Sequence, residues 1–219
     1  MDTGNGSSSI AIIDYGMGNL RSVQKGLEHV GFAAAVTRDP ARITAAAGVV
    51  LPGVGAFRAC MDNLRTYDLV EPVRRVIAAG VPFLGICLGM QLLFEESEEF
   101  GRVPGLGVLP GRVVRFPDTP ALKVPHMGWN RIRKCQNPPH LQGIDDGSFT
   151  YFVHSYYVVP AEPSLTATTT EYGIEFTSAV ARDNVFATQY HPEKSQAVGL
   201  KILANFGRLA CGGSASRHE

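Results

Sequence analysis

The sequence predicts an α/β fold: an open, mixed and largely parallel sheet flanked by helices, with a second half rich in β-hairpins. In the first half, short apolar runs alternate with helical patterns, which is typical of parallel strands joined by crossover helices. From Leu106 onward, turn residues separate β-rich runs instead. With 219 residues, 45% of them hydrophobic, the chain can bury the core of one domain.

Three buried strands are predicted in the first half: Ile10–Ile13, Val49–Leu51 and Val81–Ile86. A helix follows the first strand, and we expect Asn19 to cap it and Gly31 to end it. A helical region over residues 57–79 follows the second strand, and Pro72 is expected to interrupt or kink it.

The second half has the chemistry of hairpins. Pro110-Gly111 and Asp183-Asn184 are predicted turns between β-rich runs such as Phe149–Val159. A short strand is expected over Asn184–Thr188, and a last helix over about Ser195–Ala210. No internal repeat or linker marks a second domain. We therefore expect one domain over residues 10–210, with flexible ends at residues 1–9 and 211–219.

Composition excludes several classes of function. The 20 basic and 20 acidic residues balance, so nucleic acid is not an expected partner. Residues 1–9 lack the basic start and apolar stretch of a signal peptide, and no apolar run reaches the roughly 18 residues of a membrane helix. The four cysteines form no C-x-x-C pair and no cluster with histidine. We expect a cytoplasmic enzyme with no metal, no cofactor and no membrane partner.

Cys87 interrupts the apolar run Val81–Phe94, with Gly85 and Gly89 flanking it symmetrically. This is a cysteine version of the nucleophile elbow, in which a strained strand-to-helix turn leaves no room for side chains at the glycines. A thiol at a helix N-terminus is favoured as the thiolate. A buried structural cysteine is the alternative interpretation of this motif.

A candidate base follows the predicted strand near the C-terminal end of the chain. His191 and Glu193 are two residues apart, and in an extended segment such residues face the same side. Glu193 is then expected to accept a hydrogen bond from one imidazole nitrogen while the other nitrogen faces outward. Cys87, His191 and Glu193 would supply the nucleophile, base and orienting group of an acyl-transfer triad, which is assembled in space.

These motifs resemble a known family. Gly85-Ile-Cys-Leu-Gly-Met-Gln91 with His191-Pro-Glu193 is similar to the class I glutamine amidotransferases, whose triad is Cys, His and Glu. Four stretches resemble the glutaminase subunits of imidazole glycerol phosphate synthase in particular: Asp14–Leu20, Leu51–Phe57, Pro125–Asn130 and His191–Ser195. The resemblance runs from about Ile10 to about Leu209.

The resemblance implies roles for further residues. In the family, the loop matching Gly53–Gly55 supplies a backbone N–H to an oxyanion hole, together with the residue after the nucleophile. The oxyanion residues would be Val54, Gly55 and Leu88, and those that hold glutamine would be Gly53, Gln91, Glu99, Ser155 and Tyr156. The glycines alone are also compatible with a simple turn.

Two of these positions have plainer interpretations, and so has the neighbouring His154. Gln91 could be a solvated helix residue, but its i, i+4 spacing from Cys87 favours a place on the same helix face. Glu99 lies in a run of acidic residues, which is typical of a solvated surface. His154 is expected to support the site without taking part in the chemistry.

The Gly16–Gly18 motif also begins a dinucleotide fingerprint, but Arg21 stands where the third glycine belongs. In the family this loop faces a (β/α)₈-barrel synthase subunit instead. The resemblance implies a partner interface of Gly18, Asn19, Met127, Trp129, Asn130 and Tyr151. A tryptophan can also pack on the core, although it is a frequent interface anchor.

The function implied is hydrolysis of glutamine to glutamate and ammonia through a Cys87 thioester. The ammonia would pass to the barrel subunit, as its heterodimer partner, to make imidazole glycerol phosphate. Two alternatives are a glutaminase of another pathway, such as pyridoxal phosphate synthesis or γ-glutamyl hydrolysis, and a non-catalytic binding subunit. Pro52–Gly55 and His191–Ser195 disfavour the first, and the intact triad disfavours the second.

Overall fold

The structure, a computed structural model, describes residues 9–118 and 122–212. Its strands are β1 (Ile10–Ile13), β2 (Ala34–Thr37), β3 (Gly48–Gly53), β4 (Phe83–Cys87), β5 (Phe94–Ser97), β6 (Val103–Pro104), β7 (Leu109–Arg115), β8 (His126–Arg131), β9 (Arg133–Lys134), β10 (Phe149–His154), β11 (Tyr156–Pro160), β12 (Thr166–Tyr172), β13 (Ile174–Arg182) and β14 (Val185–Thr188). Its helices are α1 (Leu20–His29), α2 (Pro40–Thr44), α3 (Phe57–Thr66), α4 (Val70–Ala78), α5 (Leu88–Gln91) and α6 (Gln196–Cys211). Three short 3₁₀ turns cover Pro139–Leu141, Pro163–Leu165 and Pro192–Lys194.

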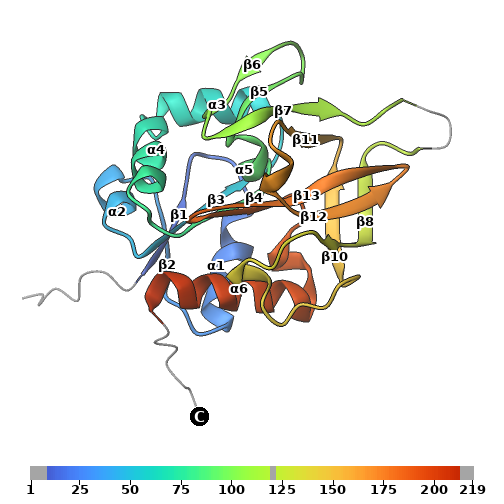
Figure 1. Cartoon of the computed structure of the whole chain (residues 1–219). Helices are drawn as coiled ribbons and strands as arrows, with labels where there is room; N and C mark the ends of the chain where they lie inside the picture. The colour runs from blue at the N-terminus through green and yellow to red at the C-terminus, as the bar shows by residue number, and fades with distance from the viewer. Residues whose placement is uncertain (1–8, 119–121, 213–219) are drawn as a thin grey trace, which may run out of the picture.

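One mixed sheet forms the centre of the molecule, with strand order β2-β1-β3-β4-β14-β13-β11-β7-β5-β6 and with β12 beside β13 (Figure 1). The first five strands in this order are parallel, and most of the rest pair antiparallel. Strands β8 and β10 form a separate two-stranded sheet. The predicted fold class is confirmed, including the β-rich second half.

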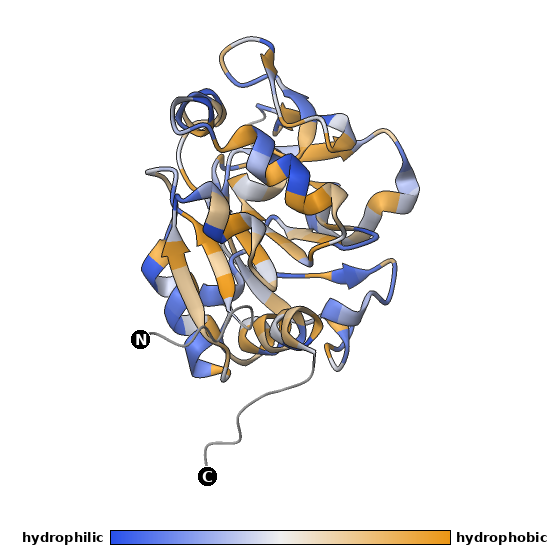
Figure 2. Cartoon of the chain, turned by 90° about the vertical axis from the view of Figure 1, so that its left-hand side faces the viewer, coloured by the Kyte–Doolittle hydropathy of each residue, from blue (hydrophilic) through white to orange (hydrophobic). Residues whose placement is uncertain are grey.

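Helices cover both faces of the parallel strands. Ala11 and Ile13 of β1 pack with the apolar sides of α2, α3 and α4, whereas Ile10 and Ile12 pack with α1 and α6. This alternation follows from the two-residue period of a strand, and burial on both faces explains its unbroken apolar sequence. Figure 2 shows the hydrophobic strands in the interior and the hydrophilic outer sides of the helices.

The helical region over residues 57–79 is two helices, and the prediction that Pro72 breaks it is wrong. The break lies between α3 and α4, where Asp68 has a φ of +54°. Pro72 is the third residue of α4. The first four N–H groups of a helix have no intrahelical acceptor, so a proline there removes no helical hydrogen bond.

The two predicted turns have different outcomes. Asp183-Asn184 is confirmed as the connection between β13 and β14. The Pro110-Gly111 turn is wrong, because both residues lie inside β7, where Gly111 pairs with Pro160. A Cβ on Gly111 would lie 2.4 Å from the carbonyl oxygen of Val159, so glycine permits close strand pairing here.

The helix ends agree with the predictions in position. Asn19 directly precedes α1, although its side chain makes no capping hydrogen bond, and Gly31 follows the end of the helix. The last helix ends at Cys211, before a left-handed Gly212. Most of the predicted flexible ends, residues 1–8 and 213–219, lie outside the described residues.

Among residues 9–118 and 122–212, no helix is both long enough and apolar enough to cross a membrane.

Candidate active site

Cys87 is the last residue of β4 and directly precedes α5, with φ +55° and ψ −113°. A non-glycine residue in this region of φ/ψ space is strained, and such strain is characteristic of nucleophile elbows. The neighbouring glycines are required by packing. A Cβ on Gly89 would lie 1.8 Å from the carbonyl oxygen of Leu51, and one on Gly85 would lie 2.9 Å from Cβ of Ala187.

The helix after the nucleophile is shorter than the sequence suggests. Of the helix-like stretch up to Phe94, only Leu88–Gln91 is helical, and Phe94 begins β5. The partial charge at the start of α5 is therefore that of a single turn. Gln91 is buried at the end of that turn, and its side chain donates hydrogen bonds to the Tyr156 carbonyl in β11 and to Gln189.

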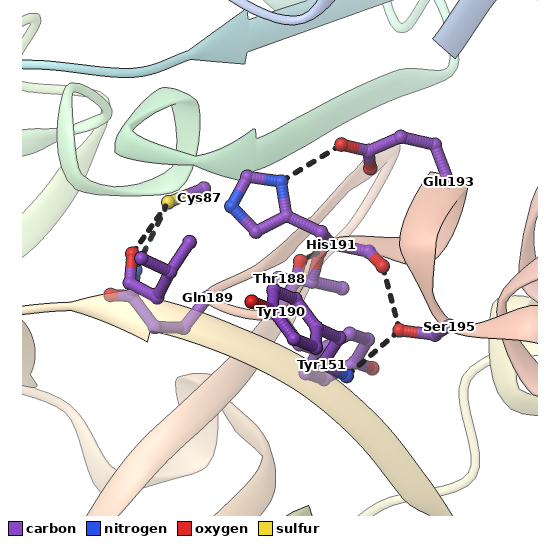
Figure 3. A network of polar contacts seen from close by, with 9 residues as sticks. Cys87, Tyr151, Thr188, Gln189, Tyr190, His191, Glu193 and Ser195 are labelled. Atoms are coloured by element: carbon purple, nitrogen blue, oxygen red, sulfur yellow. Dashed lines mark hydrogen bonds and ion pairs between the residues drawn. The ribbon is translucent and has the colours of Figure 1, made fainter. Parts of the chain in front are cut away.

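His191 and Glu193 form the predicted hydrogen bond, with 2.8 Å between Nδ1 and Oε1, and their side chains are 2% and 1% exposed. The local geometry differs from the extended segment that we expected, because Pro192–Lys194 forms a 3₁₀ turn. The imidazole lies between Cys87 and Glu193, with its other nitrogen facing the sulfur side (Figure 3). Within the described part of the chain, Nε2 has no hydrogen-bond partner.

The electrostatics of His191 favour the imidazolium. Burial alone would lower its pKa, but interactions with Cys87 and with Glu193 outweigh burial and raise the pKa to about 10. At neutral pH the histidine therefore carries a proton that it can donate to a leaving group.

The backbone of β10 holds the histidine loop in place. The N–H of His191 donates to the carbonyl of Tyr151 at 2.9 Å, and the N–H of Tyr151 donates to Oγ of Ser195 at 3.0 Å. The Ser195 hydroxyl donates in turn to the carbonyl of His191 at 2.6 Å. These bonds explain why a serine follows the His-Pro-Glu segment at this spacing (Figure 3).

Gln189 is a site residue that the sequence analysis missed. It is fully buried, and its Nε2 lies 3.7 Å from Sγ of Cys87. Its Oε1 accepts a hydrogen bond from Nε2 of Gln91 at 2.9 Å, and the same Nε2 donates to the carbonyl of Tyr156 at 3.0 Å. The signal in the sequence was a polar side chain at the end of an apolar strand, two residues before His191.

A pocket of about 330 Å³ opens over Cys87 and His191. Pro125, Val153 and His154 line it in addition to predicted residues. The predicted residues at its wall, besides Cys87 and His191, are Val54, Gly55, Leu88, Gln91, Glu99, Ser155 and Tyr156. Gly53 does not line the pocket: it pairs with Cys87 across β3 and β4.

Two buried side chains donate hydrogen bonds to backbone carbonyls at the end of β3 and in the loop after it. The Tyr15 hydroxyl donates to the carbonyl of Pro52 at 2.7 Å, and the Cys60 thiol donates to the carbonyl of Val54 at 3.5 Å. Burial raises the pKa of Cys60 to about 11, so this thiol keeps its proton. Gly55 has a φ of +93°, a conformation that glycine adopts at low cost.

Glu99 closes one end of the pocket, and its carboxylate accepts a hydrogen bond from the N–H of Phe57 at 2.6 Å, at the start of α3. This bond fixes one oxygen at a helix N-terminus, a favourable place for an anion. A carboxylate here can face an ammonium group, and Ser155 and Tyr156 line the same pocket.

The predicted interface residues occupy two places. Met127 and Trp129 of β8 are 62% and 46% exposed, and the indole packs edge-on against Tyr151 at 5.9 Å. Asn130 is turned inward by contacts described below. Gly18 and Asn19 lie in the loop between β1 and α1, partly exposed.

Within residues 9–118 and 122–212, no group of three or more histidine, cysteine or acidic side chains is arranged to hold a metal ion.

Solved structures resemble the fold of this chain. One is described as the crystal structure of glutamine amidotransferase, with a TM-score of 0.71 at 19% identity over 92% of this chain and 98% of that one. PurLQS from Thermotoga maritima matches with a TM-score of 0.68 at 17% identity, over 93% and 97% of the two chains. At these identities the similarity establishes the architecture alone.

Sequence comparison is more specific. A family model described as glutamine amidotransferase class-I matches residues 11–209. An imidazole glycerol phosphate synthase subunit HisH from Syntrophotalea carbinolica is 62% identical over 91% of this chain and 100% of its own length. The protein of that name from Geobacter sulfurreducens is 58% identical over 92% and 99%. The chain therefore belongs to the class I glutamine amidotransferases, and within them to the HisH subunits of imidazole glycerol phosphate synthase.

Proposed function

We propose that this chain is the glutaminase subunit of imidazole glycerol phosphate synthase, with Cys87, His191 and Glu193 as its catalytic triad. The observation that carries the proposal is the buried His191–Glu193 pair, whose histidine faces Cys87 (Figure 3) and lines the same pocket as that cysteine. The cysteine and histidine come from the ends of adjacent parallel strands, β4 and β14, although they are far apart in sequence.

The chemistry follows from this arrangement. The Cys87 sulfur attacks the side-chain amide carbon of glutamine, and N–H groups of the Val54–Gly55 loop and Leu88 stabilise the oxyanion. The imidazolium of His191 donates its proton to the departing ammonia. As a base, His191 then activates the water that hydrolyses the γ-glutamyl thioester, while Glu193 orients the ring.

Glutamine would be held by both of its charged ends. Glu99 faces the ammonium group, and the backbone at Ser155 and Tyr156 faces the carboxylate. Gln91 supports this wall through its bond to the Tyr156 carbonyl. Gly53, a predicted substrate residue that does not line the pocket, acts by letting β3 approach Leu88 and Gly89, since a Cβ there would lie 2.7 Å from the Gly89 nitrogen.

The second part of the proposal concerns the partner. Ammonia must be consumed before it is lost to solvent, and a (β/α)₈-barrel synthase subunit is the proposed consumer, in a cytoplasmic heterodimer. The exposed Met127 and Trp129 on β8 are a suitable docking surface. Gly18 and Asn19 extend the proposed interface, with Tyr151 supporting Trp129 from the neighbouring strand.

The test is glutamine hydrolysis by the purified chain, titrated first with the barrel subunit and then with the nucleotide ligand of the barrel. We expect low activity alone and a rise on each addition, because the peptide groups of the Gly53–Gly55 loop can rotate at low cost. A resting loop that points a carbonyl rather than an N–H at the substrate lacks one oxyanion donor. Missing one oxyanion donor lowers a rate by roughly 10²–10³. Trp129→Ala should reduce the stimulation and spare the basal rate. Full activity in the isolated chain, unchanged by either addition, would contradict the partner dependence.

A further inference from the structure

Two buried histidines that the proposed chemistry does not use are connected to the pocket wall. Nδ1 of His154 lies 2.8 Å from the carbonyl oxygen of Tyr156, and Nε2 of His154 lies 3.0 Å from Nδ1 of His126. Nε2 of His126 lies 3.2 Å from Nδ2 of Asn130. The histidines are 7% and 2% exposed. They form a continuous chain of hydrogen bonds from the pocket to β8.

The pocket end of this chain fixes one proton and, for neutral rings, the direction of the others. A carbonyl only accepts, so Nδ1 of His154 carries the proton that it donates to Tyr156. The other nitrogen of this neutral ring then accepts, which requires His126 to donate from its Nδ1. Nε2 of His126 is therefore an acceptor. If both rings are neutral, this end therefore places each ring proton on Nδ1.

The other end of the chain gives the same direction independently. Oδ1 of Asn130 accepts from the N–H of Arg131 at 2.8 Å, and Nδ2 donates to the carbonyl of Glu171 at 2.9 Å. These two bonds orient the amide so that its N–H₂ faces His126 as a donor. Nε2 of His126 must then accept, which leaves its proton on Nδ1, and Nε2 of His154 accepts that proton in turn, so both rings are neutral. Burial lowers the pKa of His126 to about 4 and that of His154 to about 3, which agrees with two neutral rings.

Aromatic side chains hold the rings in place. His126 is stacked between Phe152, at 4.7 Å, and Tyr172, at 4.0 Å. His154 packs against Phe116 and Phe176, each at 5.2 Å. A phenylalanine would fill such a cage without burying polar nitrogens, so packing alone does not require an imidazole. The ring nitrogens are explained by the bonds that they make.

These bonds end at the place where the chain passes from one sheet to the other. Ser155 separates β10 from β11, and His154, Ser155 and Tyr156 all line the pocket. The Tyr156 carbonyl receives hydrogen bonds from both His154 and Gln91. The direction of the backbone groups at this corner is therefore set by side chains from β10 and from α5.

We propose that His126 and His154 are positioning residues for substrate, a pair that fixes the Ser155–Tyr156 corner against the amino-acid end of glutamine. The inference rests on the proposed function, since it assumes that this pocket binds glutamine. His154 acts on the corner directly, and His126 acts through His154. Neither ring takes part in proton transfer with Cys87 or His191.

The test compares two electrophiles that react with the same thiol. A glutamine-like chloroketone requires recognition of the amino-acid end, whereas iodoacetamide does not. In His126→Phe the aromatic stacking is kept and the hydrogen bonds are lost. We expect labelling of Cys87 by the chloroketone to slow by about tenfold, the scale of one buried hydrogen bond, with iodoacetamide labelling within threefold of wild type. Steady-state hydrolysis should show the same increase in KM with kcat little changed.

Two further variants make the result specific. His126→Asn keeps an N–H at the position of Nδ1 and should restore at least part of the chloroketone rate. His140→Phe is the matched control, because His140 is also buried and stacked on a phenylalanine ring but lies outside this chain of bonds. It should leave both labelling rates unchanged.

Equal slowing of both electrophiles in His126→Phe would overturn the inference, and so would an unchanged KM. If His126→Phe does not fold, the His126→Asn variant decides. Its rate of chloroketone labelling is compared with that of Phe152→Ala, a variant in which only the packing around the ring is disrupted. If His126→Asn is labelled no faster than Phe152→Ala, the inference is overturned. Failure of the proposed function is a separate outcome. In that case wild-type Cys87 would show no preference for the glutamine-like reagent.

Discussion

Replacing Glu193 by glutamine removes one charge and little else. The carboxylate contacts Nδ1 of His191 at 2.8 Å, and both side chains are almost completely buried. Taking about 4 Å between the charge centres and an effective dielectric constant of about 20, the carboxylate stabilises the imidazolium by roughly 4 kcal/mol. At about 1.4 kcal/mol for each pKa unit, this corresponds to roughly three units.

This is an upper limit for the contribution of Glu193, because interactions with Cys87 raise the pKa of His191 as well. We therefore expect Glu193→Gln to lower the His191 pKa from about 10 by up to roughly three units. Near pH 8 the wild-type ring is protonated, whereas a fall of the full three units would leave about nine-tenths of the variant rings neutral. The supply of protons to the leaving ammonia falls accordingly, and the ring also loses its orienting partner. Glutamine hydrolysis should slow by roughly 10- to 10³-fold, less than in His191→Ala.

The assay is an NMR titration of the histidine ring protons, with the His191 signal assigned by its loss in His191→Ala. Hydrolysis rates from pH 6 to pH 8 provide the functional measurement. The variant should recover activity, relative to wild type, as the pH falls from 8 to 6 and the ring regains its proton. A pKa within half a unit of wild type, or a wild-type rate, would refute the assignment of Glu193 as the partner that controls His191.

Three other perturbations have definite outcomes. Gly89→Ala should lower the free energy of unfolding by about 3 kcal/mol or more in a urea titration, because the new Cβ would lie 1.8 Å from the Leu51 carbonyl oxygen. A loss below about 1 kcal/mol would contradict the packing argument. His140 stacks on Phe186, has no hydrogen bond from either ring nitrogen within the described chain, and has a pKa lowered to about 4 by burial. Its folded-state pKa lies below the unfolded value, so the folded protein loses stability as the pH falls from about 6.5 toward 4. His140→Phe should therefore be more stable than wild type by about 1–3 kcal/mol at pH 7, and this difference in the free energy of unfolding should widen in acid. A difference that does not change with pH would disprove the titration. Cys87→Ser should abolish hydrolysis with an unchanged circular dichroism spectrum, and a glutamine-like electrophile should label none of the three remaining cysteines; turnover near the wild-type level would exclude Cys87 as the nucleophile.

Local patterns predicted the parts of the fold that depend on neighbours in sequence. The strands around Val50 and Leu84 are apolar because both faces of the sheet are covered, and the glycines at 85 and 89 mark a turn that has no room for side chains. The His191–Glu193 contact was predicted correctly although the turn was not. Residues two apart can meet in either an extended or a 3₁₀ segment.

The missed features depend on residues that are distant in sequence. The contacts of Gln189 with Gln91 and Cys87 span 98 and 102 positions, and no spacing rule brings such residues together. The wrong Pro110-Gly111 turn has the same cause, because Gly111 pairs with Pro160 of β11. The wrong break at Pro72 has a local cause. A proline breaks a helix only in its interior, and Pro72 lies in the first turn of α4, just after the break at Asp68.

The position of β14 in the sheet has a consequence for synthesis and folding. This strand lies between β4 and β13, so it joins the parallel half of the sheet to the antiparallel half, and it is supplied by residues 185–188. A chain emerging from the ribosome can build the two halves, but it cannot unite them until Thr188 has cleared the exit tunnel. Contacts of such long range form late and slowly. Until then Cys87 has no histidine beside it, so the nascent protein holds its reactive thiol apart from the group that would activate it.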